Sequence, residues 1–317
     1  MQLGMLLHPE RGMDPVLEEA RVADQQGFDS VWVSDHLMDT RGQDGPDGPF
    51  DSLTLMTAVG AVTSRTRLAW AMLNPSFDYP AILAKRLSTL DHITHGRVIC
   101  TLGAGWFKEE YRAYNVPLID DHDQRIEHER EVIRLLKELW THPAPDKVTF
   151  KGRFVQCTDL PFNPAPFQRP HPPIWVGGDS EATLGLVKEL ADGWVMLTSG
   201  NPETLQRVRS AADWPTRRMT LVRNAWVFVA ETESAAIAEA SREFAAGGPR
   251  MRGTLDEFLK AHVVGTPAQC VQRLNEFESW GINYVRINFG TPQHQEAAAR
   301  LLLPLLDPDV RPVEAFV

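Results

Sequence analysis

Short apolar segments alternate with helical segments along most of the chain, and this alternation limits the possible folds more than any other feature. The apolar segments lack polar alternation, which is typical of parallel strands that are buried on both faces. We predict eight such strands, at residues 3–8, 30–33, 67–73, 98–102, 174–176, 193–198, 221–229 and 284–288. Because right-handed crossovers make consecutive strands parallel, this order predicts an α/β fold of the (β/α)8 TIM-barrel type. A doubly wound open sheet is the alternative.

One segment departs from the alternation. Residues 147–157 form short alternating stretches around Gly152, a pattern that predicts a β-hairpin. Residues 160–173 follow with six prolines, which favour a stiff and extended connection. We therefore expect a single domain over residues 1–317, with an insertion at about residues 141–173.

Residue types at helix ends locate several of the helices. Asp14 is expected to cap the first helix, which Gly27 ends, and Ser180 is expected to cap the helix after the fifth strand. Residues 121–140 form an amphipathic helical pattern. The histidines and acids of this segment, including Glu129, are expected on a solvated face, so we predict no metal site.

The composition favours a small-molecule partner. A formal net charge of −10 opposes binding to nucleic acid or to an anionic membrane surface, because each would repel the protein. Residues 1–12 contain no basic segment followed by an apolar one, so we expect a cytoplasmic protein. The three cysteines are widely separated and odd in number, which disfavours a disulfide framework.

The carboxyl ends of the predicted strands carry polar residues and glycines. In a parallel barrel these ends meet at one mouth, where the fold carries its chemistry. The candidate residues are His8, Asp35, His36, Asn74, Gly103, Ala104, Gly105, Trp106, Gly177, Gly178, Asp179 and Ser180, with Thr198 and Ser199 beside them. Two glycine turns at one mouth suit a large planar ligand with a phosphate tail, because missing Cβ atoms let a ligand approach the backbone.

Residues 177–183 offer a phosphate site at a helix N-terminus, where amide N–H groups lie beside the hydroxyls of Ser180 and Thr183. The carboxylates of Asp179 and Glu181 would repel a phosphate unless they point away from it. A well-capped helix start without a ligand is the alternative interpretation of this segment.

His36 is the candidate for proton transfer, since it follows Asp35 at a strand end and an imidazole titrates near neutral pH. A histidine that is hydrogen-bonded at the start of a loop is the alternative. The sequence contains no nucleophile signature and no P-loop lysine. A site without these groups usually depends on a cofactor for its chemistry.

The order of several short motifs resembles the bacterial-luciferase-like superfamily of flavin-dependent oxidoreductases. These motifs lie at residues 31–36, 80–85, 90–91, 96–97, 103–106, 110–111, 173–178, 191–194 and 265–267. The resemblance implies a TIM barrel that binds FMN or the deazaflavin coenzyme F420 (F-420) noncovalently at the strand ends. It implies a ring near His8, His36, Asn74 and residues 103–106, a phosphate near residues 177–180, and further cofactor contacts at Glu110 and Arg125.

The same resemblance implies a homodimeric monooxygenase that uses reduced FMN and dioxygen on a small organic substrate, with a separate flavin reductase as partner. His36 and Asp35 would be its catalytic residues, while the loop at 39–49 and the hairpin would exclude water. Hydride transfer with F420 is one alternative, and a flavin-binding barrel without turnover is another. Deazaflavin relatives that oxidise sugar phosphates carry a glutamate proton donor directly after the Gly-x-Gly turn, where this chain has Trp106.

Overall fold

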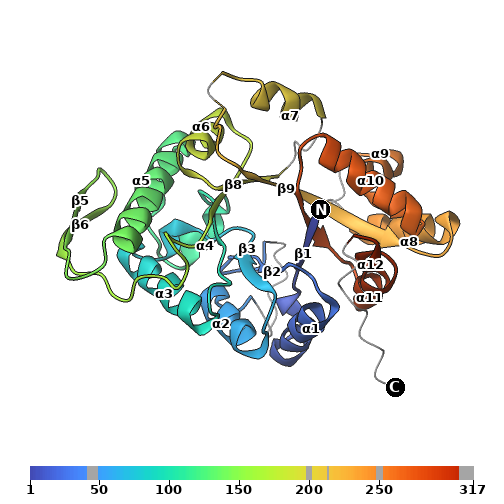
Figure 1. The fold of residues 1–317 in the computed structure, drawn as a ribbon, viewed down its shortest axis with the longest axis horizontal. Coiled ribbons are helices and arrows are strands. Elements are labelled where there is room, and N and C mark those ends of the chain that lie inside the picture. Colours follow the sequence, from blue (N-terminus) through green and yellow to red (C-terminus); the bar gives the residue numbers. More distant parts are fainter. Residues whose placement is uncertain (41–48, 198–201, 213, 248–252, 307–317) are drawn as a thin grey trace.

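Parallel strands form a ring at the centre of the computed structural model, which describes residues 1–40, 49–197, 202–212, 214–247 and 253–306 (Figure 1). The strands of the ring are β1 (Gln2–Leu6), β2 (Ser30–Val33), β3 (Arg67–Trp70), β4 (Cys100–Leu102), β7 (Ile174–Gly177), β8 (Gly193–Met196), β9 (Thr220–Val229) and β11 (Tyr284–Asn288). Each of them overlaps a strand that the sequence predicts. The predicted TIM-barrel fold is therefore confirmed.

The ring closes between β3 and β4. Hydrogen-bonded neighbours follow the order β3-β2-β1-β11-β9-β8-β7-β4. The two ends of this series meet through two isolated parallel bridges, Leu68–Val98 and Leu73–Leu102. The alternative of an open doubly wound sheet is therefore wrong, because such a sheet leaves two unpaired edge strands.

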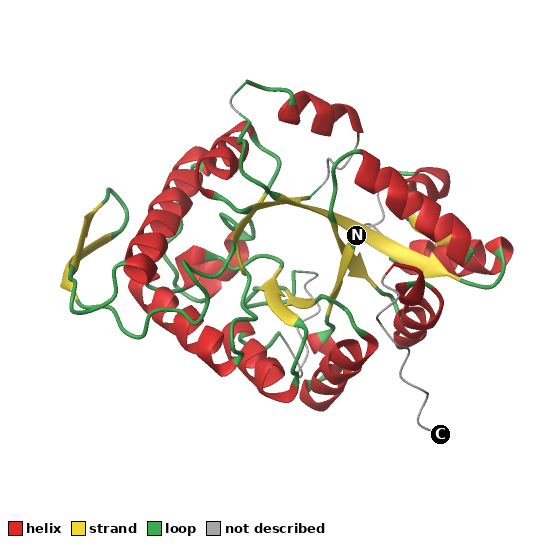
Figure 2. Cartoon of the chain, in the orientation of Figure 1, coloured by secondary structure: helices red, strands yellow, loops and turns green. Residues whose placement is uncertain are grey.

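Helices surround the strand ring on its outer side (Figures 1 and 2). They are α1 (Met13–Gln26), α2 (Ser52–Val62), α3 (Pro80–Ile93), α5 (His122–Thr141), α6 (Glu181–Leu190), α7 (Pro202–Arg209), α8 (Glu233–Ala246), α9 (Leu255–Ala261), α10 (Pro267–Ser279), α11 (Pro292–Leu301) and α12 (Leu303–Leu306), with short 3-10 turns at η1 (Pro9–Arg11) and η2 (Pro75–Phe77). The short helix α4 (Lys108–Ala113) lies inside this circle of helices, near the centre of the view (Figure 1). Within the described ranges, no helix has the length and apolar character that a membrane span requires.

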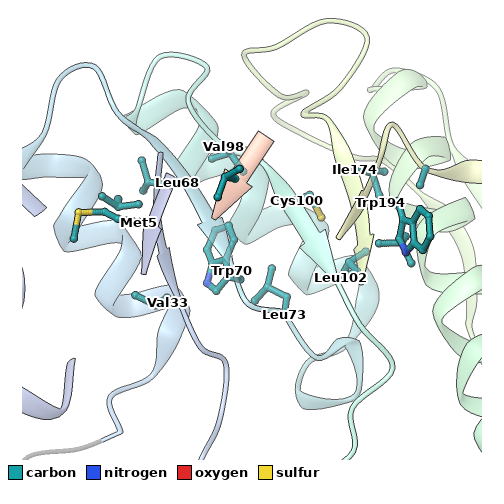
Figure 3. Close-up of a cluster of buried hydrophobic side chains, with 14 of the residues drawn as sticks. Met5, Val33, Leu68, Trp70, Leu73, Val98, Cys100, Leu102, Ile174 and Trp194 are labelled. Carbon is teal, nitrogen blue, oxygen red and sulfur yellow. The ribbon is translucent and has the colours of Figure 1, made fainter. Parts of the chain in front are cut away.

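Most residues of the barrel strands are apolar because both faces of the strands are buried. Outward-facing side chains such as Val33 and Trp70 pack in the layer between strands and helices (Figure 3). Inward-facing side chains fill the barrel, where the rings of Trp32, Trp175 and Tyr284 lie with centroids 5.2 to 6.3 Å apart. A filled barrel leaves its chemistry to the strand ends.

The predicted hairpin lies between α5 and β7. Its antiparallel strands are β5 (Val148–Lys151) and β6 (Gln156–Leu160), and they project beyond the ring of helices next to α5 (Figure 2). The Glu131 carboxylate of α5 accepts hydrogen bonds from the backbone amides of Arg153, Phe154 and Val155 at 2.7 to 2.9 Å. These three bonds attach the hairpin turn to the helix.

Three local predictions are wrong. Gly12 caps α1 in place of Asp14, because the chain enters the helix with a φ of 103° that favours glycine. Strand β10 (Val263–Gly265) pairs with the carboxyl half of β9, and its three residues are too few to show a periodic pattern. Glu129 is fully buried, although its acidic surroundings in the sequence predict a solvated face.

Candidate active site

A histidine and a glutamate form a pair at the end of β2. The Nδ1 atom of His36 lies 3.2 Å from both carboxylate oxygens of Glu110, which belongs to α4. The buried Glu110 carboxylate also accepts a hydrogen bond from the Leu37 amide at 3.0 Å. A carboxylate on Nδ1 orients an imidazole and leaves its Nε2 atom for proton transfer. Glu110, predicted as a cofactor contact, therefore lies against His36.

The Asp35 carboxylate connects three segments near this pair. Its Oδ2 atom accepts a hydrogen bond from the Asn74 amide at 2.8 Å, and its Oδ1 atom accepts one from the Ser52 hydroxyl at 2.7 Å. Burial raises the pKa of Asp35 to about 6, and these two hydrogen bonds oppose that rise. Asp35 thus holds the end of β2 against the end of β3 and the start of α2.

Gly105 lies where two side chains meet. It has a φ of +71°, and a Cβ atom there would lie 2.2 Å from the Tyr111 hydroxyl and 2.7 Å from Asn74 Nδ2. The Asn74 amide donates a hydrogen bond to that hydroxyl at 2.6 Å. Packing within the protein therefore accounts for glycine at this position, and a contact of Gly105 with a ligand stays a prediction.

The Met72 side chain fills the space between the two predicted glycine turns. A Cβ atom on Gly103 would lie 3.1 Å from Met72 Cβ, and one on Gly177 would lie 2.2 Å from Met72 Cε. Ala104 is half-buried and packs against the outer core. The two turns therefore do lie side by side, as the sequence predicts, with a methionine between them.

Trp106 is the most exposed aromatic side chain near His36, with 65% of its surface accessible. Its ring centroid lies 5.7 Å from that of His36 in an edge-on arrangement, and 5.4 Å from that of Phe107. An indole has no proton that it can transfer at neutral pH. Trp106 therefore offers His36 an apolar wall and no second acid.

The start of α6 forms the predicted group of hydrogen-bond donors. The Ser180 hydroxyl caps the helix by accepting a hydrogen bond from the Thr183 amide at 3.1 Å. The amides of Glu181 and Ala182 donate to no residue in the described part of the chain. Gly178 precedes the cap with a φ of +138°, in contact with Thr183. Orphan amides of this kind bind anions at helix N-termini.

Side chains around this helix start supply further charge. Asp179 Oδ1 accepts a hydrogen bond from the Leu197 amide at 3.3 Å, so one carboxylate oxygen is directed to the end of β8. His122 Nε2 lies 3.1 Å from the Ser180 hydroxyl. Arg125 donates to two carbonyls of the loop before α5 at 2.8 and 2.9 Å, and its Nη2 atom lies 3.5 Å from His122 Nδ1. Arg125 therefore holds that loop and His122 in place.

His8 has a partner outside the predicted site. Its Nδ1 atom lies 2.7 Å from the Glu19 carboxylate of α1, and Arg11 lies 3.6 Å from the same carboxylate. The structure thus joins His8 to α1. The predicted residues Thr198 and Ser199, and residues 41–48 of the predicted covering loop, lie outside the described residues.

Sequence reasoning missed Met72 and His122 as parts of this region, and it noted Tyr111 only as part of the motif at residues 110–111. Met72 and Tyr111 touch the glycine turns from other segments, and no local pattern reports such contacts. His122 lies in an acidic stretch that suggests a solvated helix face. Its place in the first turn of α5, directly after a capping aspartate, is the one signal that the sequence contained.

A cavity of about 430 Å³ opens at the opposite end of the barrel. Its lining includes Gln2, Arg67, Asp192, Thr220 and Asn283, which all lie at the amino ends of strands. Side chains at that end of a TIM barrel usually stabilise the fold. The residues at the strand carboxyl ends are therefore the stronger candidate site.

The residues at the mouth fit a flavin mononucleotide. The orphan amides of α6, the Ser180 hydroxyl and the His122 imidazole are donors that a phosphate monoester accepts. The exposed Trp106 ring and the His36 imidazole offer flat surfaces and a titratable group for a ring system.

Comparison with known proteins identifies related enzymes. A family model described as luciferase-like monooxygenase matches residues 1–284. The FMNH(2)-dependent dimethylsulfone monooxygenase of Pseudomonas putida is 29% identical over 323 residues, covering 90% of this chain and 86% of that protein. The F420-dependent glucose-6-phosphate dehydrogenase of Nakamurella multipartita is 32% identical over 203 residues, covering 61% of this chain and 55% of that protein.

A solved structure supports the fold. The long-chain alkane monooxygenase LadA superposes with a TM-score of 0.80 at 15% identity, covering all of this chain and 93% of that one. At this identity the likeness concerns the barrel fold alone.

Proposed function

The chain belongs to the luciferase-like monooxygenase family, and from that membership we propose that it is a monooxygenase that uses reduced FMN and dioxygen on a small organic substrate. The family, and the relatives named for FMNH(2) and for F420, both support a flavin-dependent oxidoreductase.

The observation that carries the proposal is the surroundings of the His36 imidazole, which lies between the Glu110 carboxylate and the Trp106 ring. Trp106 lies edge-on to the imidazole, at the position after the Gly-x-Gly turn where the resemblance places a glutamate in sugar-phosphate dehydrogenases. Among the described residues, the carboxylate that contacts the His36 ring is that of Glu110. Apolar walls favour reactions that water would quench. The relative named for FMNH(2) also matches 90% of the chain, whereas the relative named for F420 matches 61%.

The cofactor, when bound, supplies the two electrons of the reaction. In our proposal His36 holds or releases a proton at Nε2, and the Glu110 carboxylate keeps the other ring nitrogen protonated. Asp35 keeps the ends of β2 and β3 together, so that the imidazole keeps its position during turnover. The Trp106 and Phe107 rings lie edge-on to the imidazole and would limit its contact with water once a cofactor covers the mouth.

We propose that the cofactor phosphate binds at the start of α6. Ser180, His122 and the two orphan amides would hold the phosphate. The Oδ1 atom of Asp179 already accepts a hydrogen bond from the Leu197 amide, which reduces its repulsion of the phosphate. Gly178 and Thr183 shape the turn. His8, Asn74, residues 103–106 and Arg125 stay as further predicted contacts, direct or through neighbours.

Hydride transfer with F420 is the second candidate, because relatives named for that coenzyme reach 32% identity in the matched region. In either case we propose a small organic substrate and one barrel domain over the whole chain, with residues 141–173 as the insertion. A homodimer in the cytoplasm, supplied by a separate flavin reductase, completes the proposal for the FMN reaction.

Anaerobic titration of the purified protein with FMN, reduced FMN, riboflavin and F420 tests the choice of cofactor. We expect micromolar binding of reduced FMN and weaker binding of riboflavin. In a separate aerobic assay with a flavin reductase and NADH, we expect the protein to change the rate of oxygen consumption relative to the reductase alone, which consumes oxygen through free reduced FMN. Tight binding of F420 alone, without this change in oxygen consumption, would favour the second candidate. If neither cofactor binds at micromolar concentration, both candidates are wrong.

A His36→Asn variant tests turnover. We expect the variant to keep its affinity for the cofactor and to lose at least about 100-fold in rate, the usual scale of acid–base catalysis. An unchanged rate would contradict the proposed role of His36.

A further inference from the structure

An arginine that forms no ion pair with a described carboxylate lies inside the barrel, outside the set of residues discussed so far. Arg286 belongs to β11. In the sheet it lies opposite Gly4 of β1 on one side and Asn224 of β9 on the other. A Cβ atom on Gly4 would lie 2.3 Å from the Ser30 hydroxyl and 2.5 Å from Trp32 Nε1, so this row of residues faces the barrel interior. The Arg286 guanidinium lies over the Trp32 ring at 5.9 Å.

The charge of Arg286 is not neutralised by any described residue. Its Nε atom is buried without a hydrogen-bond partner, and no ion pair joins it to a described carboxylate. Burial alone lowers the pKa of its guanidinium to about 10, so the side chain stays charged at neutral pH. The Asp29 carboxylate below it is occupied by Arg67 and Tyr284. A partly buried charge without a carboxylate partner is costly, so it persists in folds mainly where function needs it.

Two amides beside Arg286 also have unused hydrogen-bonding capacity. The Oδ1 atoms of Asn224 and Asn288 are both buried and have no hydrogen-bond partner among the described residues, although Asn224 donates to the Met196 carbonyl at 3.0 Å. Asn288 is two residues after Arg286 on the same strand, so the two side chains share a face. Since an amide can turn over, Asn288 can present its NH2 group to a ligand oxygen.

The strand order separates these residues from the expected cofactor contacts. His36, Asn74 and residues 103–106 follow β2, β3 and β4, and Ser180 follows β7, whereas Arg286 and Asn224 lie on β11 and β9. In the ring, β9 and β11 lie across the barrel from β3 and β4. A ligand at Arg286 therefore approaches the cofactor from the opposite wall, which is where a substrate belongs.

We propose that Arg286, with the amides of Asn288 and Asn224 beside it, is an anion-binding subsite that holds a carboxylate or sulfonate group of the substrate. The guanidinium donates two parallel hydrogen bonds to the oxyanion, Asn288 donates a third, and Asn224 Oδ1 accepts from a protonated group or an ordered water. This inference rests on the proposed function, because it names the class of substrate for that reaction: a small organic acid anion.

A matched pair of probes tests the subsite: methanesulfonate, and the neutral dimethyl sulfone, in which a methyl group replaces the charged oxygen. Saturation-transfer NMR of the methyl protons measures both affinities on the full-length protein. We expect methanesulfonate to bind more tightly than dimethyl sulfone. Arg286→Met should weaken methanesulfonate by roughly tenfold or more and leave dimethyl sulfone unchanged, while Arg286→Lys should be intermediate.

The unfolding temperature separates a binding role from a structural one. Arg286→Met should raise Tm, because it removes a partly buried charge that no described carboxylate neutralises, whereas the exposed Arg300→Met control should leave Tm within about a degree. A lower Tm for Arg286→Met, or an equal loss of both probes, would overturn the subsite.

Cofactor binding separates this inference from the proposed function. Arg286→Met should keep the wild-type affinity for FMN. If Arg286→Met loses FMN and keeps methanesulfonate, the arginine serves the cofactor and the subsite is wrong. The wild-type protein could bind neither FMN nor F420 and still bind methanesulfonate more tightly than the Arg286→Met variant does. In that case the proposed function fails and the anion subsite stands.

Discussion

Glu110 has two possible roles that a single substitution separates. The structure places its carboxylate on His36 Nδ1 and on the Leu37 amide, so we expect it to position the imidazole. Glu110→Gln should keep the affinity for FMN within about twofold and lower the rate by about 10- to 100-fold, with a shifted pH profile, because a neutral amide no longer stabilises the imidazolium. A large loss of FMN affinity with an unchanged pH profile would support a direct contact instead.

Gly105 allows a second test at the residue scale. Gly105→Ala places a methyl group at a φ of +71° and against the Asn74–Tyr111 hydrogen bond, so we expect a loss of about 1–3 kcal/mol in the free energy of unfolding. Gly185→Ala is the control, because a Cβ atom there meets nothing within 4 Å and alanine favours the α6 helix by up to about 1 kcal/mol. Urea unfolding measures both values, and equal stability for the two variants would contradict the packing that we describe.

The candidate residues could be predicted only in part, for a physical reason. Strand ends meet in any parallel barrel, so the sequence located His36, Asp35 and Asn74 correctly at one mouth. It could not predict that Glu110 contacts His36 or that His8 contacts Glu19, because these side-chain pairs depend on the packing of helices against strands. Arg286 was missed because an arginine inside a strand carries no motif.

At the scale of elements, the start of α6 is the structure most directly tied to the cofactor. Ser180→Ala should cost about 1 kcal/mol through the lost cap and should weaken FMN by roughly tenfold, while riboflavin, which lacks the phosphate, keeps its affinity. Thr266→Ala is the control, because Thr266 caps α10 in the same way and lies far from the start of α6 in the sequence. It should lose similar stability and keep FMN. Equal weakening of FMN and riboflavin by Ser180→Ala would contradict a phosphate contact.

Elements were easier to predict than contacts because their signals are local. Each barrel strand is a mainly apolar run bounded by turn residues, and the predicted cap Ser180 begins α6 as expected. The errors arose where tertiary structure overrides local pattern. Strand β10 exists because the long strand β9 offers it a partner, and Gly12 caps α1 because of the backbone angle that precedes it.

For the whole molecule, Glu129 makes stability depend on pH. Neither carboxylate oxygen has a hydrogen-bond partner in the described part of the chain, and burial raises the pKa of Glu129 from 4.5 to about 8. The folded protein thus retains a proton that the unfolded chain releases, so this contribution is complete below pH 4.5 and is lost as the pH rises from 4.5 to about 8. Relative to Glu129→Gln, the Tm of the wild-type protein should fall by several degrees between pH 5 and pH 8.

The control for this effect is Glu127→Gln, which changes an exposed carboxylate on the same helix and should show the wild-type dependence on pH. Differential scanning calorimetry across the pH range measures all three proteins. A Glu129→Gln variant that loses stability with pH as steeply as the wild type would show that the buried carboxyl does not ionise in this range.

The contact between β3 and β4 is the weakest strand pairing in the ring of the barrel. Most neighbouring strands share a continuous ladder, but here the ring is fastened by two bridges, with the amides of Leu73 and Gly103 donating across it at 3.0 Å. A strand pair with few hydrogen bonds opens by local unfolding more readily than the rest of the ring. This pair also leads into the turn beside Met72, which would border a bound cofactor. Hydrogen exchange at Leu73 and Gly103 should therefore be faster than within the β1–β11 ladder, and FMN should slow it. The exchange rate of the β3–β4 amides would then report whether the cofactor is bound. Unchanged exchange on saturation with FMN would place the cofactor elsewhere.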